Sequence, residues 1–543
     1  MSRHTYITTP IYYVNDKPHI GHAYTTTICD VFARFMRFDG DDVFFLTGTD
    51  EHGIKIEKSA QARGISPQAL ADKNAKEFKA MMAQLQLGFD DFIRTTEARH
   101  VRQVECLVGR LRASDAVYLG EFEGWYDEGQ EEYHTETRAR DLQYKSPVSG
   151  APLVRAREKN YYFRLSAFQK PLEELFERCP DFVRPPARRN EVLGQLRKGL
   201  QDVPMSRTNF TWGVPMPGDP EHVIYVWIDA LMNYITALGL AEPDGDAYRR
   251  RHAYWPPAYH VIGKEILWFH AVIWPALLMA LELALPECIY AHSFWIRDGQ
   301  KMSKILGNFI DLKTIESYVD RYGLDTWRYY MATKGPLGAT DADFSSAHFH
   351  EIYTTDLVNT LGNCASRVTA MIGKYVNGVV PTESPGGTRI AVGNHDWPAI
   401  CQQAVADAQR AMRRFELASS IGSAIGLIRR VDGFINLTEP YKIAKDKTRG
   451  DELGAILYQC LEAIRIGSLL LWAVMPQRMN QLWEAMGLSI DPTTDRLTTL
   501  SAWGGLEVGR RVQRIALFPR IDAPLEADAS SCRQPTAESR EAT

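Results

Sequence analysis

Short apolar runs alternate with amphipathic stretches through the first half of the chain. Apolar runs that predict β-strands occupy residues 5–14, 41–53, 222–229, 258–263 and 289–296. Residues 21–38 carry apolar side chains at helical spacing, and charged helical sequence follows the second run to about residue 114. Strands that alternate with helices are typical of βαβ units, so this half predicts an α/β fold with a parallel sheet.

The pattern changes twice along the chain. From about residue 116 to 210 the runs are short and rich in Tyr, Glu, Arg, Gly and Pro, which predicts a domain inserted into the sheet. From about residue 346 the periodicity is almost entirely helical, notably over 356–376 and 416–440. The last twenty or so residues are polar and predict a disordered tail.

These changes set the expected domain boundaries. The two halves of the α/β domain are expected at residues 1–115 and 216–296, the insertion at 116–215, a loop and connecting region at 297–345, a helical domain at 346–510, and a C-terminal extension, largely disordered, at 511–543.

Composition narrows the class of protein. The 543 residues are 45% hydrophobic and 24% charged, which is ordinary for a soluble globular protein with a large core. The net charge of −5 means that any nucleic-acid surface must be a local basic patch. The eight cysteines form no C-x-x-C pair, which disfavours zinc knuckles and fits a reducing compartment.

One apolar stretch, residues 266–285, is about as long as a membrane span. It contains His270, Pro275 and Glu282, and polar sequence precedes it. We expect a buried helix of a large domain there, and no membrane partner.

Two histidines stand where the first predicted strand gives way to a helix. His19 and His22 could form a metal site, an acid/base pair, a phosphate-binding helix start or an ordinary turn. The start of a helix offers unpaired N–H groups to phosphate, and Gly21 lets the backbone approach a ligand closely. A metal site would need a third ligand, which nothing nearby supplies, so phosphate binding is favoured.

A second basic motif, K-M-S-K, follows the last predicted strand. Lys301 and Lys304 stand three residues apart in a Gly-containing loop, and two ammonium groups on such a loop suit a triphosphate. The alternative, a solvated basic turn, is less favoured once the histidine pair is considered with it.

Together, H-I-G-H and K-M-S-K resemble the signature pair of class I aminoacyl-tRNA synthetases. Seven stretches extend the resemblance to the methionyl-tRNA synthetases, over nearly all of the chain up to about residue 510: PIYYVNDKPHIGH, FLTGTDEHGIKI, NYYFRLSAFQKPL, SRTNFTWGVPMPGDPEHVIYVWIDALMNY, HVIGKEILWFHAVIWPALL, KMSKILGN and NCASR.

The resemblance implies a fold and an activity. The fold is a Rossmann-like catalytic domain with an inserted connective domain and a stem-contact region, followed by an all-α helix bundle that binds the anticodon. The activity is methionine–tRNA ligase. Methionine reacts with ATP, which arrives with Mg²⁺, to give methionyl-adenylate and pyrophosphate. The methionine then passes to the 3′-terminal adenosine of tRNA(Met).

The resemblance also assigns site residues. The implied catalytic residues are His19, His22, Lys301 and Lys304, and the ATP site adds Gly21, Gly263 and Lys264. The implied methionine pocket consists of Ile11, Tyr13, Asp50, Trp227, Ala230, Leu231, Tyr234, Ile266, His270 and Trp274, with Asp50 as counter-ion of the ammonium group. The implied anticodon contacts are Asn363, Arg367 and Tyr441.

The chain departs from the family in three places. Many relatives carry zinc-binding cysteines in the insertion, whereas the matching positions here are Asp127, Gln130, Ser146 and Ser149, so we predict no structural zinc. Tyr441 stands where a stacking tryptophan is usual, and tyrosine can still stack on a base. Ile305 replaces the usual serine after K-M-S-K, although both lysines remain.

The remaining expectations concern state and alternatives. The chain carries no appended dimerisation domain and no Arg/Ser-rich leader, so we expect a cytoplasmic monomer. A sister synthetase for leucine, isoleucine, valine or cysteine is one alternative. A catalytically inactive relative that binds RNA is the other, and the retained histidines and lysines disfavour it.

Overall fold

The computed structural model describes residues 3–14, 17–127, 132–134, 136–256, 258–297, 299–302, 308–384 and 395–525. Four residues or segments with predicted roles lie outside this described part: Gln130, Lys304, Ile305 and the tail from residue 526.

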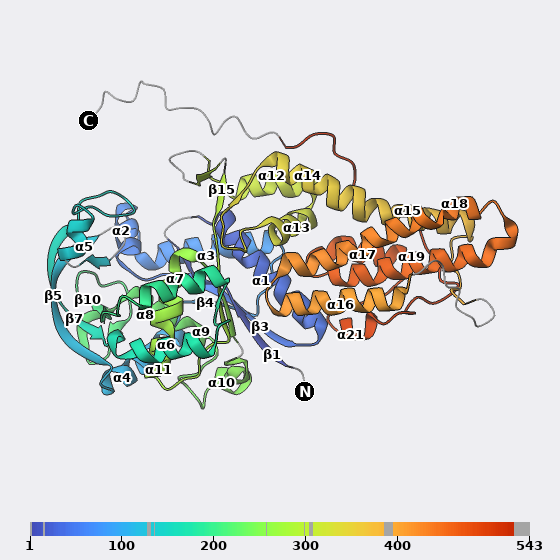
Figure 1. Cartoon of the computed structure of the whole chain (residues 1–543). Helices are drawn as coiled ribbons and strands as arrows, with labels where there is room; N and C mark the ends of the chain where they lie inside the picture. Colours follow the sequence, from blue (N-terminus) through green and yellow to red (C-terminus); the bar gives the residue numbers. More distant parts are fainter. Residues whose placement is uncertain are drawn as a thin grey trace, which may run out of the picture.

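A seven-stranded parallel sheet forms the centre of the N-terminal half (Figure 1). Its order is β2-β3-β1-β13-β14-β8, and β4 pairs with β3. The strands are β1 (His4–Thr8), β2 (Tyr12–Tyr13), β3 (Asp42–Asp50), β4 (Asp91–Arg94), β8 (Val183–Arg184), β13 (Ala258–Gly263) and β14 (Cys288–His292). The predicted parallel α/β sheet is confirmed.

Side chains alternate between the two faces of this sheet. Val43 and Phe45 of β3 belong to one buried cluster, whereas Phe44 and Leu46 belong to another. The first cluster includes α1 (Ile20–Asp39) and continues into the helices of the C-terminal half. The second includes α4 (Ala98–Ala113), part of the insertion, and the helices after residue 225. Each face of the sheet is therefore buried by a different set of helices.

The insertion is built on a long antiparallel pair, β5 (Val117–Asp127) and β7 (Val154–Phe163), at one end of the molecule (Figure 1). The other elements of this region are β6 (Glu132–His134), α5 (Glu136–Asp141), α6 (Gln169–Arg178), α7 (Pro186–Leu196), β9 (Val203–Pro204), β10 (Ser206–Arg207) and β11 (Pro215–Met216). Within the range predicted for the insertion, β8 returns to the main sheet and pairs with β14.

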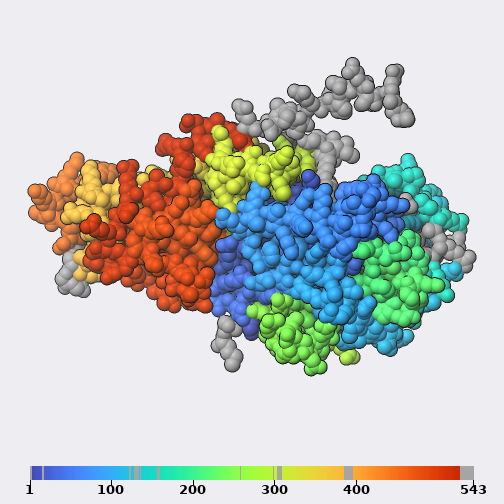
Figure 2. All heavy atoms as spheres, turned by 180° about the vertical axis from the view of Figure 1, so that it is seen from behind, coloured from blue at the N-terminus to red at the C-terminus, as the bar shows by residue number. Residues whose placement is uncertain are grey.

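Helices α12 (Leu312–Tyr322), α13 (Leu324–Lys334) and α14 (Ser346–Ile352) connect the sheet to a bundle at the opposite end of the molecule. The bundle contains α15 (Asn363–Tyr375), α16 (Trp397–Arg413), α17 (Leu417–Thr438), α18 (Pro440–Ile443), α19 (Gly450–Leu471), α20 (Pro476–Ala485) and α21 (Leu497–Leu500). Seen from behind, the outline is elongated, with the bundle and the insertion at its two ends (Figure 2).

Two apolar helices are relevant to whether the chain contains a membrane span. Within the described ranges, one helix, Lys447–Leu471, is long and apolar enough to cross a membrane, and its apolar window is wholly buried in the bundle. In the stretch 266–285, a π-helical turn (Phe269–Ile273) leads into α11 (Trp274–Ala280), and both are mostly buried. The predicted buried helix is confirmed.

Several predicted elements are wrong in detail. Only residues up to 224 of the predicted strand 222–229 are extended, in β12 (Asp219–Ile224), and α8 (Val226–Leu231) follows. A short apolar run fits a strand and a buried helix equally, so periodicity could not separate them. The predicted strand 5–14 breaks at Pro10, and β4 lies within the stretch predicted as helical. The predicted strand 289–296 ends at His292, and β15 (Trp295–Arg297) pairs instead with β16 (Gln300–Lys301) and β17 (Ala342–Asp343).

Candidate active site

A cavity of about 430 Å³ opens at the carboxyl ends of four neighbouring strands. Pro10, Asp50, Gly263 and His292 line it, just beyond or at the ends of β1, β3, β13 and β14. This edge is where open parallel sheets bind their ligands. Of the predicted site residues, the cavity brings together Ile11, Tyr13, His19, Gly21, His22, Asp50, Trp227, Ala230, Leu231, Tyr234, Gly263, Ile266 and His270.

The two histidines form the cap of α1. His19 is the N-cap residue, and its Nδ1 accepts a hydrogen bond from the backbone N–H of Gly21 at 3.0 Å. His22 Nδ1 accepts from the backbone N–H of His19 at 3.2 Å, which completes a reciprocal capping box. Because a neutral imidazole carries one proton, a ring that accepts at Nδ1 must carry it at Nε2. Both rings therefore keep an Nε2–H donor.

The electrostatic setting keeps His22 neutral. Burial, and secondarily the neighbouring His19, hold the pKa of His22 well below its usual value. Gly21 is needed because a β-carbon there would lie 2.9 Å from His19 Cε1. The start of α1 thus combines a backbone that can approach an anion with two neutral N–H donors at the edge of the cavity.

An apolar wall forms the other side of the cavity. The indole of Trp227 stacks on Phe269 with ring centroids 3.9 Å apart. Tyr234 donates its hydroxyl hydrogen to His270 Nε2 at 2.8 Å, and His270 Nδ1 donates to the carbonyl of Ile266 at 3.0 Å. Burial lowers the pKa of His270 to about 4, so the ring is neutral at pH 7. The wall presents aromatic surface with its polar groups already paired.

Asp50 ends β3 at the cavity, and the loop after it is tightly held. Glu51 accepts two hydrogen bonds from Arg94, at 2.7 and 2.9 Å, and its carbonyl accepts from Trp212 Nε1 at 2.6 Å. His52 lies 2.7 Å from the buried carboxylate of Asp229. In the sequence D-E-H-G, the first residue therefore lines the cavity, and the next two, Glu51 and His52, hold the loop in place.

The carboxylate of Asp229 joins two histidines beneath this loop. His100 Nε2 lies 2.9 Å from Asp229 Oδ1, on the opposite side from His52. Burial raises the pKa of Asp229, but the two imidazoles outweigh that effect and lower the pKa to about 2. An ionised carboxylate therefore ties α8, which carries Trp227 and Ala230, to the Asp50 loop.

The described lysines of the predicted site, Lys264 and Lys301, lie at the rim, whereas Lys55 lines the cavity itself. Lys264 Nζ bonds to Asp341 at 2.6 Å and lies 4.6 Å from the centre of the Phe294 ring. Lys301 Nζ lies 5.4 Å from the same ring, and Phe294 itself lines the cavity. The two lysines thus converge on one edge of the cavity without lining it, and Lys304 is outside the described residues.

Trp274 lies behind the wall. Its Nε1 donates to His260 Nε2 at 3.3 Å, and its ring centre lies 5.9 Å from that of Tyr234. The side chain is fully buried and is not part of the lining. Trp274 therefore supports Tyr234 in this structure, and direct contact with a ligand stays a prediction.

Sequence reasoning missed nine lining residues: Pro10, Tyr12, Thr25, Lys55, Val226, Asn233, Glu265, His292 and Phe294. His292 Nε2 lies 2.8 Å from Thr25 Oγ1, and burial lowers the pKa of His292 to about 4. A signal was available for two of them. Thr25 lies one turn after His22 on the same helix face, and His292 ends a predicted strand at the edge where ligands bind.

The predicted anticodon residues lie in the bundle, on α15 and α18. Asn363 is exposed at the start of α15. One turn later, Arg367 donates to Asp432 and, at 3.1 Å, to Asn436 of α17. Tyr441 on α18 is 44% exposed, and its hydroxyl donates to Glu439 at 2.9 Å. Helices α15 and α18 both belong to the bundle at this end of the molecule (Figure 1).

The positions that match zinc ligands in relatives lie in the insertion. Asp127 and Ser146 are buried, and Ser146 Oγ accepts from the backbone N–H of Val148 at 3.3 Å and of Ser149 at 3.2 Å. The hydroxyl therefore pairs two backbone donors of a tight turn. The absence of zinc stays a prediction.

Known proteins match nearly the whole chain. Residues 5–147 and 139–369 match the family of tRNA synthetases class I (M). The methionine–tRNA ligase of Halalkalibacterium halodurans is 40% identical over 532 residues, which cover 96% of this chain and 79% of that protein. The Bacillus subtilis enzyme is 38% identical over 531 residues, which cover 96% and 78%.

A solved structure also matches. The Mycobacterium tuberculosis methionyl-tRNA synthetase in complex with methionyl-adenylate superposes with a TM-score of 0.86 at 34% identity, over 95% of this chain and all of that chain. Sheet, insertion and bundle are thus all covered, and the chain belongs to the methionyl-tRNA synthetases of class I.

Proposed function

We propose that the chain is a methionine–tRNA ligase. It joins methionine to ATP as methionyl-adenylate, with release of pyrophosphate, and then transfers methionine to the 3′-terminal adenosine of tRNA(Met). The observation that carries this function is one cavity in which a helix start with two neutral imidazoles lies opposite a wall of aromatic side chains. Membership of the family supports the same reaction.

The first step needs positioning and charge stabilisation. The methionine carboxylate is ionised at pH 7 and attacks the α-phosphorus without a general base. The Nε2–H groups of His19 and His22 donate to phosphate oxygens as negative charge develops. Gly21 and Gly263 allow ATP to approach the backbone, and Lys264, Lys301 and Lys304 hold the leaving pyrophosphate. Mg²⁺ is expected to arrive with ATP.

The amino acid is selected by shape and by paired polar groups. Asp50 serves as counter-ion of the methionine ammonium group, and Tyr13, Trp227 and Tyr234 supply aromatic surface that suits a polarizable thioether. An apolar pocket distinguishes single methylene groups by only about 1–3 kcal/mol, so polar contacts must sharpen the choice. We propose that the hydroxyl of Tyr13 supplies such a contact to sulfur, whereas both nitrogens of His270 are already paired, with Ile266 and Tyr234, so that this ring contributes to the shape of the pocket. Ile11, Ala230, Leu231, Ile266 and Trp274 complete the proposed pocket.

The tRNA partner is expected to extend from the cavity at the sheet to the bundle. Asn363, Arg367 and Tyr441 are proposed to contact the anticodon, since Arg and Asn match exposed base edges and tyrosine can stack. We further propose that the enzyme acts as a monomer in the cytoplasm and needs no structural zinc.

The test is ATP–pyrophosphate exchange with each of the twenty amino acids in turn. Exchange that depends on methionine alone is the expected result. A better response to leucine, isoleucine, valine or cysteine would keep the ATP site and overturn the pocket assignment. Binding of tRNA without any exchange would overturn the catalytic proposal in favour of an RNA-binding role.

A further inference from the structure

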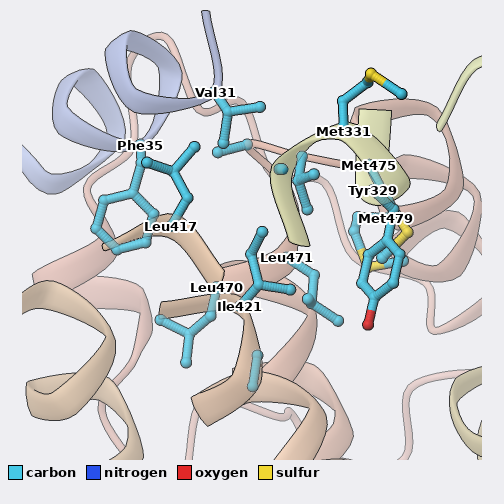
Figure 3. Packing of buried hydrophobic residues seen from close by; sticks show 14 of the residues in the cluster. Val31, Phe35, Tyr329, Met331, Leu417, Ile421, Leu470, Leu471, Met475 and Met479 are labelled. Carbon is cyan, nitrogen blue, oxygen red and sulfur yellow. The ribbon is translucent and has the colours of Figure 1, made fainter. Parts of the chain in front are cut away.

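Helix α1 belongs to two parts of the molecule at once. Its first residues line the cavity, and its later turns pack against the bundle. Figure 3 shows Val31 and Phe35 of α1 beside Leu417 of α17, in the same buried cluster as Leu470 of α19 and Met331 of α13. The phosphate-binding end of α1 is therefore attached to a helix whose other side is part of the bundle core.

A buried ion pair crosses this contact. Asp30, three turns into α1, is fully buried and accepts from Arg34 Nε at 2.8 Å and from the backbone N–H of Gly88 at 2.8 Å. Its third donor is Arg328 of α13, at 2.5 Å. Arg328 is 1% exposed, so this pair is shielded from solvent and from salt screening.

The same guanidinium reaches the bundle. Arg328 donates to the carbonyl of Ala473 at 3.1 Å and to that of Val474 at 3.2 Å, just beyond the end of α19. Carbonyls at a helix C-terminus lack helical partners and favour a cation. One side chain thus ties α1, α13 and the central bundle helix together.

A second arginine fixes the far end of α1. Arg413, the last residue of α16, donates to Asp39 at 2.5 Å and to both oxygens of Asp41 at 3.2 Å. The two carboxylates are almost fully buried, and together they raise the pKa of Arg413 above its usual value although burial alone lowers it. Helix α1 is therefore bound to the bundle at its middle and at its end.

We propose that Arg328 and Arg413 are positioning residues that hold α1 in a fixed orientation to the bundle, so that the active site and the anticodon-binding surface meet one tRNA at a fixed spacing. This inference rests on the proposed function. A rigid ligand that binds at two sites gains affinity from the second site only if the two sites stay at the separation that the ligand requires. Loosening the contact should therefore weaken tRNA charging and leave methionyl-adenylate formation intact.

The main test is Arg413→Gln in the full-length enzyme, because Arg413 is only partly buried and the variant should fold. We expect the KM for full-length tRNA(Met) in aminoacylation to rise by about tenfold or more, while methionine-dependent pyrophosphate exchange stays within about twofold of the parent. The matched control is Arg410→Gln, one turn earlier on α16, whose partner Asp407 lies on the same helix. The control should change neither reaction.

A second readout separates positioning from general damage. A minihelix that contains only the acceptor stem meets one end of the enzyme, so its charging should be unchanged in Arg413→Gln. Equal losses in exchange and charging, equal losses on minihelix and full tRNA, or no loss on full tRNA would each overturn the proposal. Arg328→Met repeats the test at the buried site, with thermal unfolding measured in parallel. Failure of the proposed function would appear separately, as an absence of methionine-dependent exchange in the parent.

Discussion

At the scale of single residues, the two nitrogens of each imidazole in the site have different partners. His19 and His22 each accept a backbone hydrogen bond at Nδ1 at the start of the helix, so the proton of each ring is on Nε2. His270 uses Nδ1 as a donor to a carbonyl and accepts from Tyr234 at Nε2. The backbone partner thus fixes the tautomer, and the tautomer decides whether the ring offers a donor or an acceptor.

Substitution of His22 tests the donor role. We expect His22→Ala to lower the kcat of pyrophosphate exchange by about 10²–10³-fold, the usual effect of removing one donor to developing charge. Methionine binding should change little, because the hydrogen bond strengthens only in the transition state. Exchange kinetics and calorimetric methionine binding measure the two effects. A comparable loss of methionine affinity would show instead that the substitution disrupts the cavity through the lost helix cap.

The pH dependence of methionine binding tests the state of His270. The folded pKa is lowered to about 4, so the neutral ring is present throughout the range above it and is lost only as pH falls through about 4. We therefore expect the calorimetric Kd for methionine to stay constant between about pH 5.5 and 8, whereas an ordinary histidine titrates near 6.5. A break in the affinity near pH 6.5 would mean that His270 is protonated in that range.

At the scale of elements, the ends of helices position several of the functional and buried polar groups. The start of α1 supplies the proposed anion site, α8 is tied by Asp229 to the loop after β3, and the start of α13 holds a buried acid. That acid is Asp325, which is 2% exposed and accepts from the backbone N–H of Arg478 at 2.6 Å. Burial raises the pKa of Asp325 to about 6, although its hydrogen bond and the nearby arginines oppose the shift.

Asp325 should make the stability of the parent depend on pH. A carboxyl with a raised folded pKa binds its proton more tightly in the folded state, so its contribution to stability is lost as pH rises from about 4 to about 6. A shift of about two units corresponds to roughly 3 kcal/mol. Asp325→Asn keeps the acceptor and cannot ionise. In urea unfolding, the free energy of unfolding of the variant should therefore rise relative to that of the parent by up to roughly 3 kcal/mol as the pH increases from 4 to 7. A difference that does not depend on pH would contradict the assignment.

Helix α15 carries the proposed anticodon contact. Arg367→Ala should leave pyrophosphate exchange unchanged and lower kcat/KM for tRNA(Met) charging by at least about tenfold, since a good side-chain contact to a base is worth about 1–3 kcal/mol. Arg429→Ala is the matched control, because Arg429 is an exposed arginine of α17 paired with Asp356. Equal losses in both reactions for Arg367→Ala would indicate misfolding or a wrong assignment.

At the scale of the whole molecule, one continuous core joins the sheet to the bundle. The buried cluster that covers one face of the sheet through α1 runs on into α13, α17, α19 and α20 (Figure 3). Closely packed interiors resist deformation, so the cluster holds the sheet and the bundle at a set distance. Arg328 and Arg413 fix the orientation of α1 within this packing. Their removal should therefore weaken tRNA charging and leave methionyl-adenylate formation unchanged.

The sequence by itself determined the parallel sheet, the insertion and the helical C-terminal half, and the motifs H-I-G-H and K-M-S-K indicated the family, because periodicity and short motifs are local properties. Only the tertiary structure decided that residues 226–229 are helical, that Trp274 lies behind Tyr234, and that His292 meets Thr25. It also decided that Arg328 closes on Asp30 across 298 positions of the chain. A one-dimensional pattern tells which side of an element is buried, but the neighbour that buries it is set by how all the elements pack together.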